Sequence, residues 1–230
     1  LYYSFVENII PDQVIDKSIY QPQLDSLTIN IPYNTENAQR VKIALYKYGG
    51  DDIMSHINVC LLSCDTKAIS IAFAYAHLTL LLRKDISNML SHKAVSDFSF
   101  TLQKVLHERH IMTGFIRFQE SSHGVLYAKY QPDNDITQLL APHFLRRLND
   151  IPFIIHDIKR KKIAISNGKS IKIQYTDLPA NFNPSQNEKA INELWKKYFR
   201  SVNIQERKNT KQQDNYFPRR YRKYCFECWE

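Results

Sequence analysis

The spacing of apolar residues changes near residue 112, and this change limits the folds open to the chain. Before it, apolar side chains recur with the 3.6-residue period of amphipathic helices; the run Ser91–Met112 places Val95, Phe98 and Leu102 on one face. After it, short stretches alternate between apolar and polar residues, as strands do. Helices and strands are therefore expected in separate parts of the sequence, which is typical of an α+β fold.

The elements follow from local signals. Asn34 or Thr35 can cap a helix that Gly49 ends. The helices of the first part are expected at residues 35–48, 51–63, 66–84 and 91–112, after a short strand at Ser26–Ile31 that stops at Pro32. The second part is expected to hold strands at Phe115–Phe118, Val125–Tyr130, Phe153–Ile158, Lys162–Ser166 and Ser170–Tyr175, with helices at residues 135–149 and 188–200.

Asn167-Gly168 is the strongest turn signal, because both residues of a tight hairpin turn need a positive φ. It predicts an antiparallel pair of strands, and the alternation of the second strand predicts a sheet with one wet, basic face. We expect two regions: a mainly helical N-terminal region over residues 1–94, and an α+β domain over 95–230 with an antiparallel sheet packed by helices and a basic C-terminal helix and tail.

Charge is distributed unevenly along the chain. The formal net charge is +8, and it comes from residues 146–230, which hold 19 basic and nine acidic side chains. Residues 195–224 alone hold ten basic and two acidic side chains. A basic block of this kind indicates a polyanionic partner, or a solvated face with no partner at all.

Several classes of site are excluded or disfavoured. The five glycines are too scattered to write a dinucleotide-binding or P-loop motif. Cys225-x-x-Cys228 has zinc-knuckle spacing but lacks a second ligand pair unless Cys60 and Cys64 supply it, and neither pair has the third cysteine of a radical S-adenosylmethionine site. The run 107–110 is not a metalloprotease motif. No metal and no cofactor are expected.

The chain is expected to be soluble and cytoplasmic. Leu1–Ile10 has neither the basic leader nor the small-residue cleavage site of a signal peptide. The most apolar run, Ala68–Leu82, is too short to span a bilayer. No membrane partner is expected.

Two sets of residues are candidates for function. An acid–base site could form from histidines near the sheet with carboxylates and an arginine to orient them, namely His143, His156, Asp157, Glu108, Arg109 and His110. The alternative is that the histidines are hydrogen-bonded groups that tie helices to the sheet. A nucleic-acid surface could form from cations that contact phosphates and aromatic rings that stack on bases, namely Arg117, Arg147, Lys159, Arg160, Lys196, Arg207, Arg219, Arg220, Tyr216 and Tyr221.

Several blocks of the sequence resemble a bacterial family of DNA metabolism and repair proteins whose defining domain has no established function. The blocks lie within residues 95–224: E-R-H…G-F-I-R-F from Glu108, L-A-P-H-F from Leu140, I-I-H-D…K-R from Ile154, and L-W-K-K-Y-F…P-R-R-Y from Leu194. Members of that family are encoded beside a radical S-adenosylmethionine protein, and the domain also occurs fused to a uracil-DNA-glycosylase-like domain. The resemblance implies a role in DNA repair or modification beside the enzyme that performs the chemistry.

Three hypotheses remain. The leading one is a DNA-binding accessory protein that acts with a radical S-adenosylmethionine enzyme. The second is a nuclease- or glycosylase-like hydrolase that uses the histidines and carboxylates above. The third is a scaffold whose basic tail docks an acidic protein.

Overall fold

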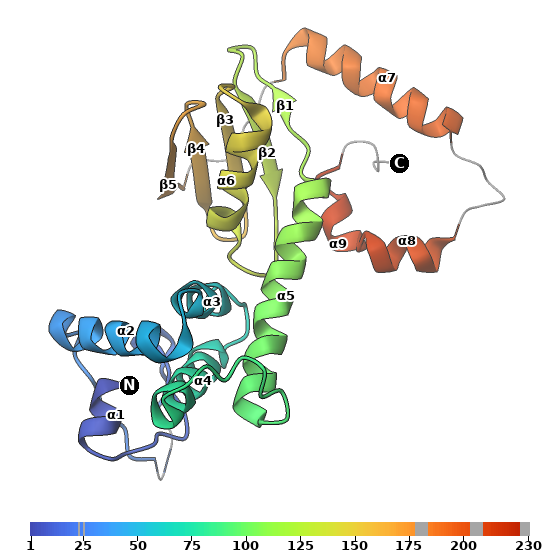
Figure 1. Ribbon diagram of the computed structural model, residues 1–230. Helices are drawn as coiled ribbons and strands as arrows, with labels where there is room; N and C mark the ends of the chain where they lie inside the picture. Colours follow the sequence, from blue (N-terminus) through green and yellow to red (C-terminus); the bar gives the residue numbers. More distant parts are fainter. Residues whose placement is uncertain (23, 25, 178–183, 203–208, 226–230) are drawn as a thin grey trace. The chain divides into compact units, whose positions relative to one another are not determined.

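The computed structural model describes residues 1–22, 24, 26–177, 184–202 and 209–225, with its elements labelled in Figure 1. The chain divides into two compact units, Leu1–His107 and Glu108–Glu230. The division falls inside the long helix α5 (Lys93–Phe115). The boundary predicted at residues 94/95 lies near the start of this same helix.

The first unit is helical, as the apolar period predicts. It contains α1 (Tyr2–Val6), a 3-10 turn η1 (Lys17–Ile19), α2 (Thr35–Gly49), α3 (Ile53–Cys60), α4 (Ala68–Leu82) and the first part of α5. The side chain of Asn34 caps α2 by accepting a hydrogen bond from the amide of Asn37 at 2.9 Å. In the core, the ring of Tyr75 stacks on that of Phe98 with 3.9 Å between centroids. The four helices predicted between residues 35 and 112 are confirmed, with ends that shift by a few residues.

The strand predicted at Ser26–Ile31 is wrong. These residues are irregular, and no strand of the described chain pairs with them. The side chain of Leu27 is 91% exposed, so the alternation does not mark burial against a sheet. A strand forms only where a neighbour satisfies its backbone groups, and alternation does not supply that neighbour.

The second unit contains a five-stranded sheet in the order β1-β2-β3-β4-β5. The strands are β1 (Gln119–Glu120), β2 (Leu126–Tyr130), β3 (Phe153–Asp157), β4 (Lys162–Ser166) and β5 (Ile171–Tyr175). The hairpin predicted at Asn167-Gly168 joins β4 to β5, with Gly168 at a φ of +90°. The α+β class is confirmed.

The sheet is mixed, which corrects the prediction of an antiparallel sheet. Strands β2 and β3 run parallel, whereas the other three pairs are antiparallel. The reason is the connection: α6 (Thr137–Leu148) lies between β2 and β3 and returns the chain to the end of the sheet from which β2 starts. The strand predicted at Phe115–Phe118 is also wrong, because α5 continues to Phe115 and the first strand starts at Gln119.

Helix α6 packs across one face of the sheet, as Figure 1 shows. Leu140, Ala141 and Phe144 are the buried apolar side chains of this helix. The ring of Phe118 fills the space beside them, with its centroid 5.0 Å from that of Phe144 and 5.9 Å from that of Phe153. These apolar contacts hold the end of α5, α6 and β3 together.

The described residues after the sheet include α7 (Gln186–Val202), α8 (Thr210–Tyr216) and α9 (Arg219–Arg222). The helix predicted at residues 188–200 lies within α7. The chain before α7 joins the edge of the sheet, where the amide of Ser185 donates to the carbonyl of Glu120 at 3.0 Å. Among the described residues, no helix has both the length and the apolar character that crossing a membrane requires.

Gly168 provides a test of whether the β4–β5 hairpin packs against the backbone of Asp150. A Cβ at this position would overlap the backbone oxygen of Asp150. We expect Gly168→Ala to lower the free energy of unfolding by about 3 kcal/mol, from the unfavourable backbone conformation together with this clash. The measurement is urea unfolding followed by circular dichroism.

Gly124→Ala is the matched control. Gly124 also has a positive φ, of +73°, but a Cβ added there would have nothing within 4 Å. We expect this variant to lose about 1 kcal/mol, the cost of the backbone conformation alone. Equal losses in the two variants would show that the hairpin does not pack on Asp150.

Candidate functional site

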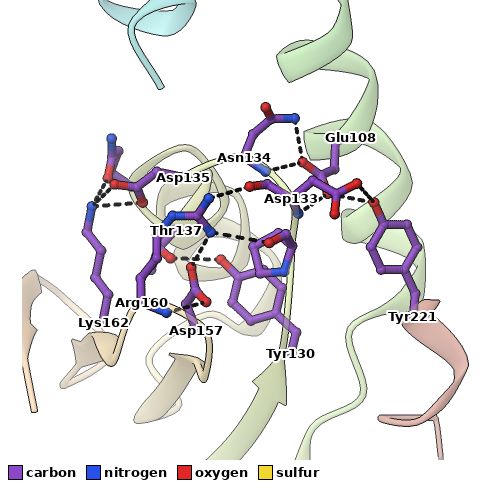
Figure 2. Close-up of polar contacts among 12 residues, drawn as sticks. Glu108, Tyr130, Asp133, Asn134, Asp135, Thr137, Asp157, Arg160, Lys162 and Tyr221 are labelled. Atoms are coloured by element: carbon purple, nitrogen blue, oxygen red, sulfur yellow. Dashed lines mark hydrogen bonds and ion pairs between the residues drawn. The ribbon is translucent and has the colours of Figure 1, made fainter. Parts of the chain in front are cut away.

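The carboxylate of Glu108 lies at the centre of a buried polar cluster (Figure 2). Its Oε1 accepts hydrogen bonds from the amide of Asp133 at 2.7 Å and from the hydroxyl of Tyr221 at 2.6 Å. Its Oε2 accepts from the amide and from the side-chain nitrogen of Asn134, at 2.8 and 2.6 Å. Four donors therefore satisfy a carboxylate that is only 5% exposed.

These bonds join three segments that are distant in the sequence. Glu108 belongs to α5, Asp133 and Asn134 to the loop between β2 and α6, and Tyr221 to α9. Burial raises the pKa of the Tyr221 hydroxyl, and the hydrogen bond to Glu108 raises it further. The hydroxyl therefore stays protonated and donates. At the solvent side of the cluster, the guanidinium of Arg220 pairs with Asp133 at 2.8 Å.

The C-terminal segment has further contacts on α5 and β2. The ring of Phe217 stacks on that of Phe115 with 4.0 Å between centroids. The hydroxyl of Tyr224 donates to Gln131 at 3.0 Å, and the thiol of Cys225 donates to the carbonyl of Phe115 at 3.3 Å. Residues 217–225 are therefore fixed to the rest of the unit by apolar and polar contacts together.

A second buried carboxylate, Asp157, extends the cluster toward the sheet (Figure 2). Its Oδ2 pairs with Arg160 at 3.0 Å, and the same guanidinium donates to the carbonyls of Pro132 and Asp133. Burial raises the pKa of Asp157 more than the contact with Arg160 lowers it. Arg160 therefore links the end of β3 to the loop that also holds Glu108.

A third ion pair lies at the N-terminal end of α6. The ammonium of Lys162, whose side chain is buried, pairs with both oxygens of Asp135 at 2.8 and 2.9 Å. Nearby, the hydroxyls of Tyr130 and Thr137 are hydrogen-bonded at 2.8 Å. Buried charges here are paired and hydrogen-bonded, which is the arrangement expected of a group that stabilises a fold.

The residues predicted as an acid–base site do not converge on one point. Glu108 and Asp157 are connected through Asp133 and Arg160, as described above. His156 lies on the opposite face of β3 from Asp157, where its Nδ1 is 2.9 Å from the hydroxyl of Tyr127. Burial lowers the pKa of His156, and the charge of Asp157 partly opposes this.

The other three predicted catalytic residues lie along α5 and α6. His110 and Arg109 are exposed on α5, and His143 is half-buried on α6. His143 lies beside arginines rather than carboxylates. Among the described residues, none of the three histidines of the predicted set is hydrogen-bonded to Glu108 or Asp157.

Arg109, His143, Arg146 and Arg147 form what we call the arginine face. The guanidinium of Arg147 reaches from α6 to α5, where it donates to the carbonyl of Thr113 at 3.4 Å. The pKa of His143 is lowered by partial burial and then by the charges of Arg147, Arg146 and Arg109, in that order. Within the described ranges, none of these three exposed arginines has an ion pair with a carboxylate.

Most cations predicted to contact phosphate already have internal partners. Arg219 pairs with Asp214 at 3.0 Å and Lys196 with Glu193 at 3.0 Å. Arg160 is part of the buried network and Arg220 pairs with Asp133. Arg117 donates to the carbonyl of Gly114 at 2.7 Å.

The other residues predicted to contact nucleic acid differ in how exposed their side chains are. Lys159 is exposed, and so is Tyr216, at 73%. Tyr221 is 5% exposed, so its ring has no open face for a base; the stacking role predicted for it is wrong. Arg207 lies outside the described residues, as does Cys228.

The members of the buried cluster that were not predicted for any site include Asp133, Asn134, Asp135 and Lys162. A polar run directly after a predicted strand was the available signal, since such a loop lies at a sheet edge. Arg109 was predicted to serve acid–base chemistry, although the structure places it with Arg146 and Arg147. Among the described residues, no group of three or more His, Cys, Asp or Glu side chains is arranged to hold a metal ion.

These features define an α+β protein with a saturated buried acidic cluster and an exposed arginine face. A family model for a domain of unknown function, DUF4130, matches residues 66–227. The chain therefore belongs to this family. Neither the curated proteins nor the solved structures gave a match.

The bond from Tyr221 to Glu108 can be tested directly. Tyr221→Phe removes one donor to a buried charge and keeps the ring, so we expect the free energy of unfolding to fall by about 2 kcal/mol. The measurement is urea unfolding at neutral pH. Tyr216→Phe, the same change at an exposed ring, should have no measurable effect; equal losses would contradict the role given to Tyr221.

Proposed function

We propose that this protein is a DNA-binding accessory protein in DNA repair or modification, and that it acts with a radical S-adenosylmethionine enzyme. The observation that carries the proposal is the arginine face: three exposed guanidinium groups from two helices, without carboxylate partners in the described chain. Guanidinium groups recognise phosphate through paired hydrogen bonds, and phosphates release counterions when cations neutralise them.

The buried cluster supports a binding role over hydrolysis. A catalytic carboxylate must reach a substrate atom or a water molecule. Glu108 instead accepts four hydrogen bonds from protein groups, and Asp157 is fully buried against Arg160. The cavity beside Tyr221, lined by residues such as Met112 and Tyr130, measures about 10 Å³, which is the space of one water molecule.

The resemblance to DNA metabolism and repair proteins supports the biological setting, including the radical enzyme as partner. Helix α7 supports the accessory role. Its apolar side chains Ile191, Leu194 and Tyr198 are 55%, 65% and 56% exposed and recur at helical spacing along one face. Exposed apolar stripes of this kind are typical of surfaces that a partner protein covers.

The proposal predicts salt-dependent DNA binding through the arginine face. The apparent affinity should fall as salt rises, with a slope on logarithmic axes of about 0.9 per phosphate contacted on a duplex and about 0.7 on a single strand. Arg109→Gln and Arg147→Gln should each weaken binding several-fold and reduce that slope by about one contact. The measurement is fluorescence anisotropy of labelled DNA across a series of salt concentrations that begins at low salt.

Arg40→Gln is the control, because Arg40 is an exposed arginine that already pairs with Glu36 at 2.7 Å. It should leave affinity and slope unchanged. No binding at low salt, or binding that does not depend on salt, contradicts the proposed function. Equal effects of all three substitutions would show that the arginine face is not the DNA-binding surface.

A further inference from the structure

The arginine face has a defined geometry. Arg109 and Thr113 are one helical turn apart on α5, and His143 and Arg147 are one turn apart on α6. Arg147 contacts Thr113 across the two helices at 3.4 Å. Arg109 also lies near enough to His143 for its charge to act on that imidazole, so side chains from both helices contribute to the arginine face.

The face concentrates more positive charge than a single internal phosphate can neutralise. The charges of three guanidinium groups act on one imidazole, and in the described chain no carboxylate pairs with these arginines. A phosphodiester brings one negative charge. A terminal phosphate monoester brings about 1.5 to 2 negative charges and three acceptor oxygens.

We propose that the arginine face binds the terminal phosphate monoester of a nucleic-acid strand. This inference rests on the proposed function and narrows it to strand ends, as at a nick, a break or a trimmed end. Arg109 and Arg147 approach the phosphate from opposite helices, and Arg146 adds charge from the exposed side of α6. His143 lies among them and donates a ring N–H to a phosphate oxygen.

The state of His143 fits this ligand. Burial lowers the pKa of His143 most, and the charges of Arg147 and Arg146 from its own helix and of Arg109 from α5 lower it further. A phosphate dianion among these groups reverses the local charge balance. Binding should therefore raise the pKa of His143, because the anion favours the imidazolium form.

The test compares two single-stranded oligonucleotides that differ only in a 5′-phosphate or a 5′-hydroxyl, with a second pair that differs at the 3′ end. We expect the full chain to bind a phosphorylated end about tenfold more tightly than the matching hydroxyl end, as charge-assisted hydrogen bonds to a dianion predict. Arg109→Gln and Arg147→Gln should remove this preference. Arg40→Gln should retain it.

An NMR titration of His143 provides a second readout. Saturation with the phosphorylated strand should raise its pKa, and the hydroxyl strand should raise it less. If all strands bind equally and the arginine variants weaken all of them alike, the inference is wrong while the proposed function stands. If no strand binds, both fail; if inorganic phosphate alone shifts His143, the site is not specific for nucleic-acid ends and the inference is overturned.

Discussion

The buried carboxylate of Glu108 is the interaction on which the second unit depends most. A buried charge is strongly unfavourable unless polar groups surround it, and here four donors from two distant segments do so. Folding must therefore bring the loop at Asp133 and the helix α9 to α5 before the charge is stabilised. The same loop receives Arg160 from the end of β3, so one set of contacts aligns the sheet, α5 and the C-terminal segment.

Much of the fold could be predicted from the sequence, because it depends on local signals. The periodicity of residues 91–112 and the Asn167-Gly168 turn are such signals, and both α5 and the β4–β5 hairpin follow from them. The parallel pairing of β2 with β3 could not be predicted in this way, because strand direction depends on the path of α6 between them. Residues 26–31 alternate like a strand but have no neighbouring strand in the described chain, which only the tertiary structure reveals.

The candidate site was harder to predict, for a physical reason. A sequence shows which groups can ionise but not whether their hydrogen bonds are already satisfied. Glu108 and Asp157 are residue types that catalysis uses, but their hydrogen bonds are already taken up within the protein. Arg219 and Arg220 could contact phosphate by charge, but they pair with Asp214 and Asp133. Arg109 and Arg147 are far apart in sequence, so only the contact of the Arg147 side chain with α5 shows that they belong to one face.

In our account the paired charges stabilise the fold, whereas the arginines of the arginine face contact DNA. Arginine-specific chemical modification tests this difference most directly. The protein would be treated with phenylglyoxal with and without single-stranded DNA, and each site quantified by mass spectrometry. We predict that DNA protects Arg109, Arg146 and Arg147, while the reactivity of Arg40 does not change. Unchanged reactivity at the arginine face under saturating DNA would contradict the account.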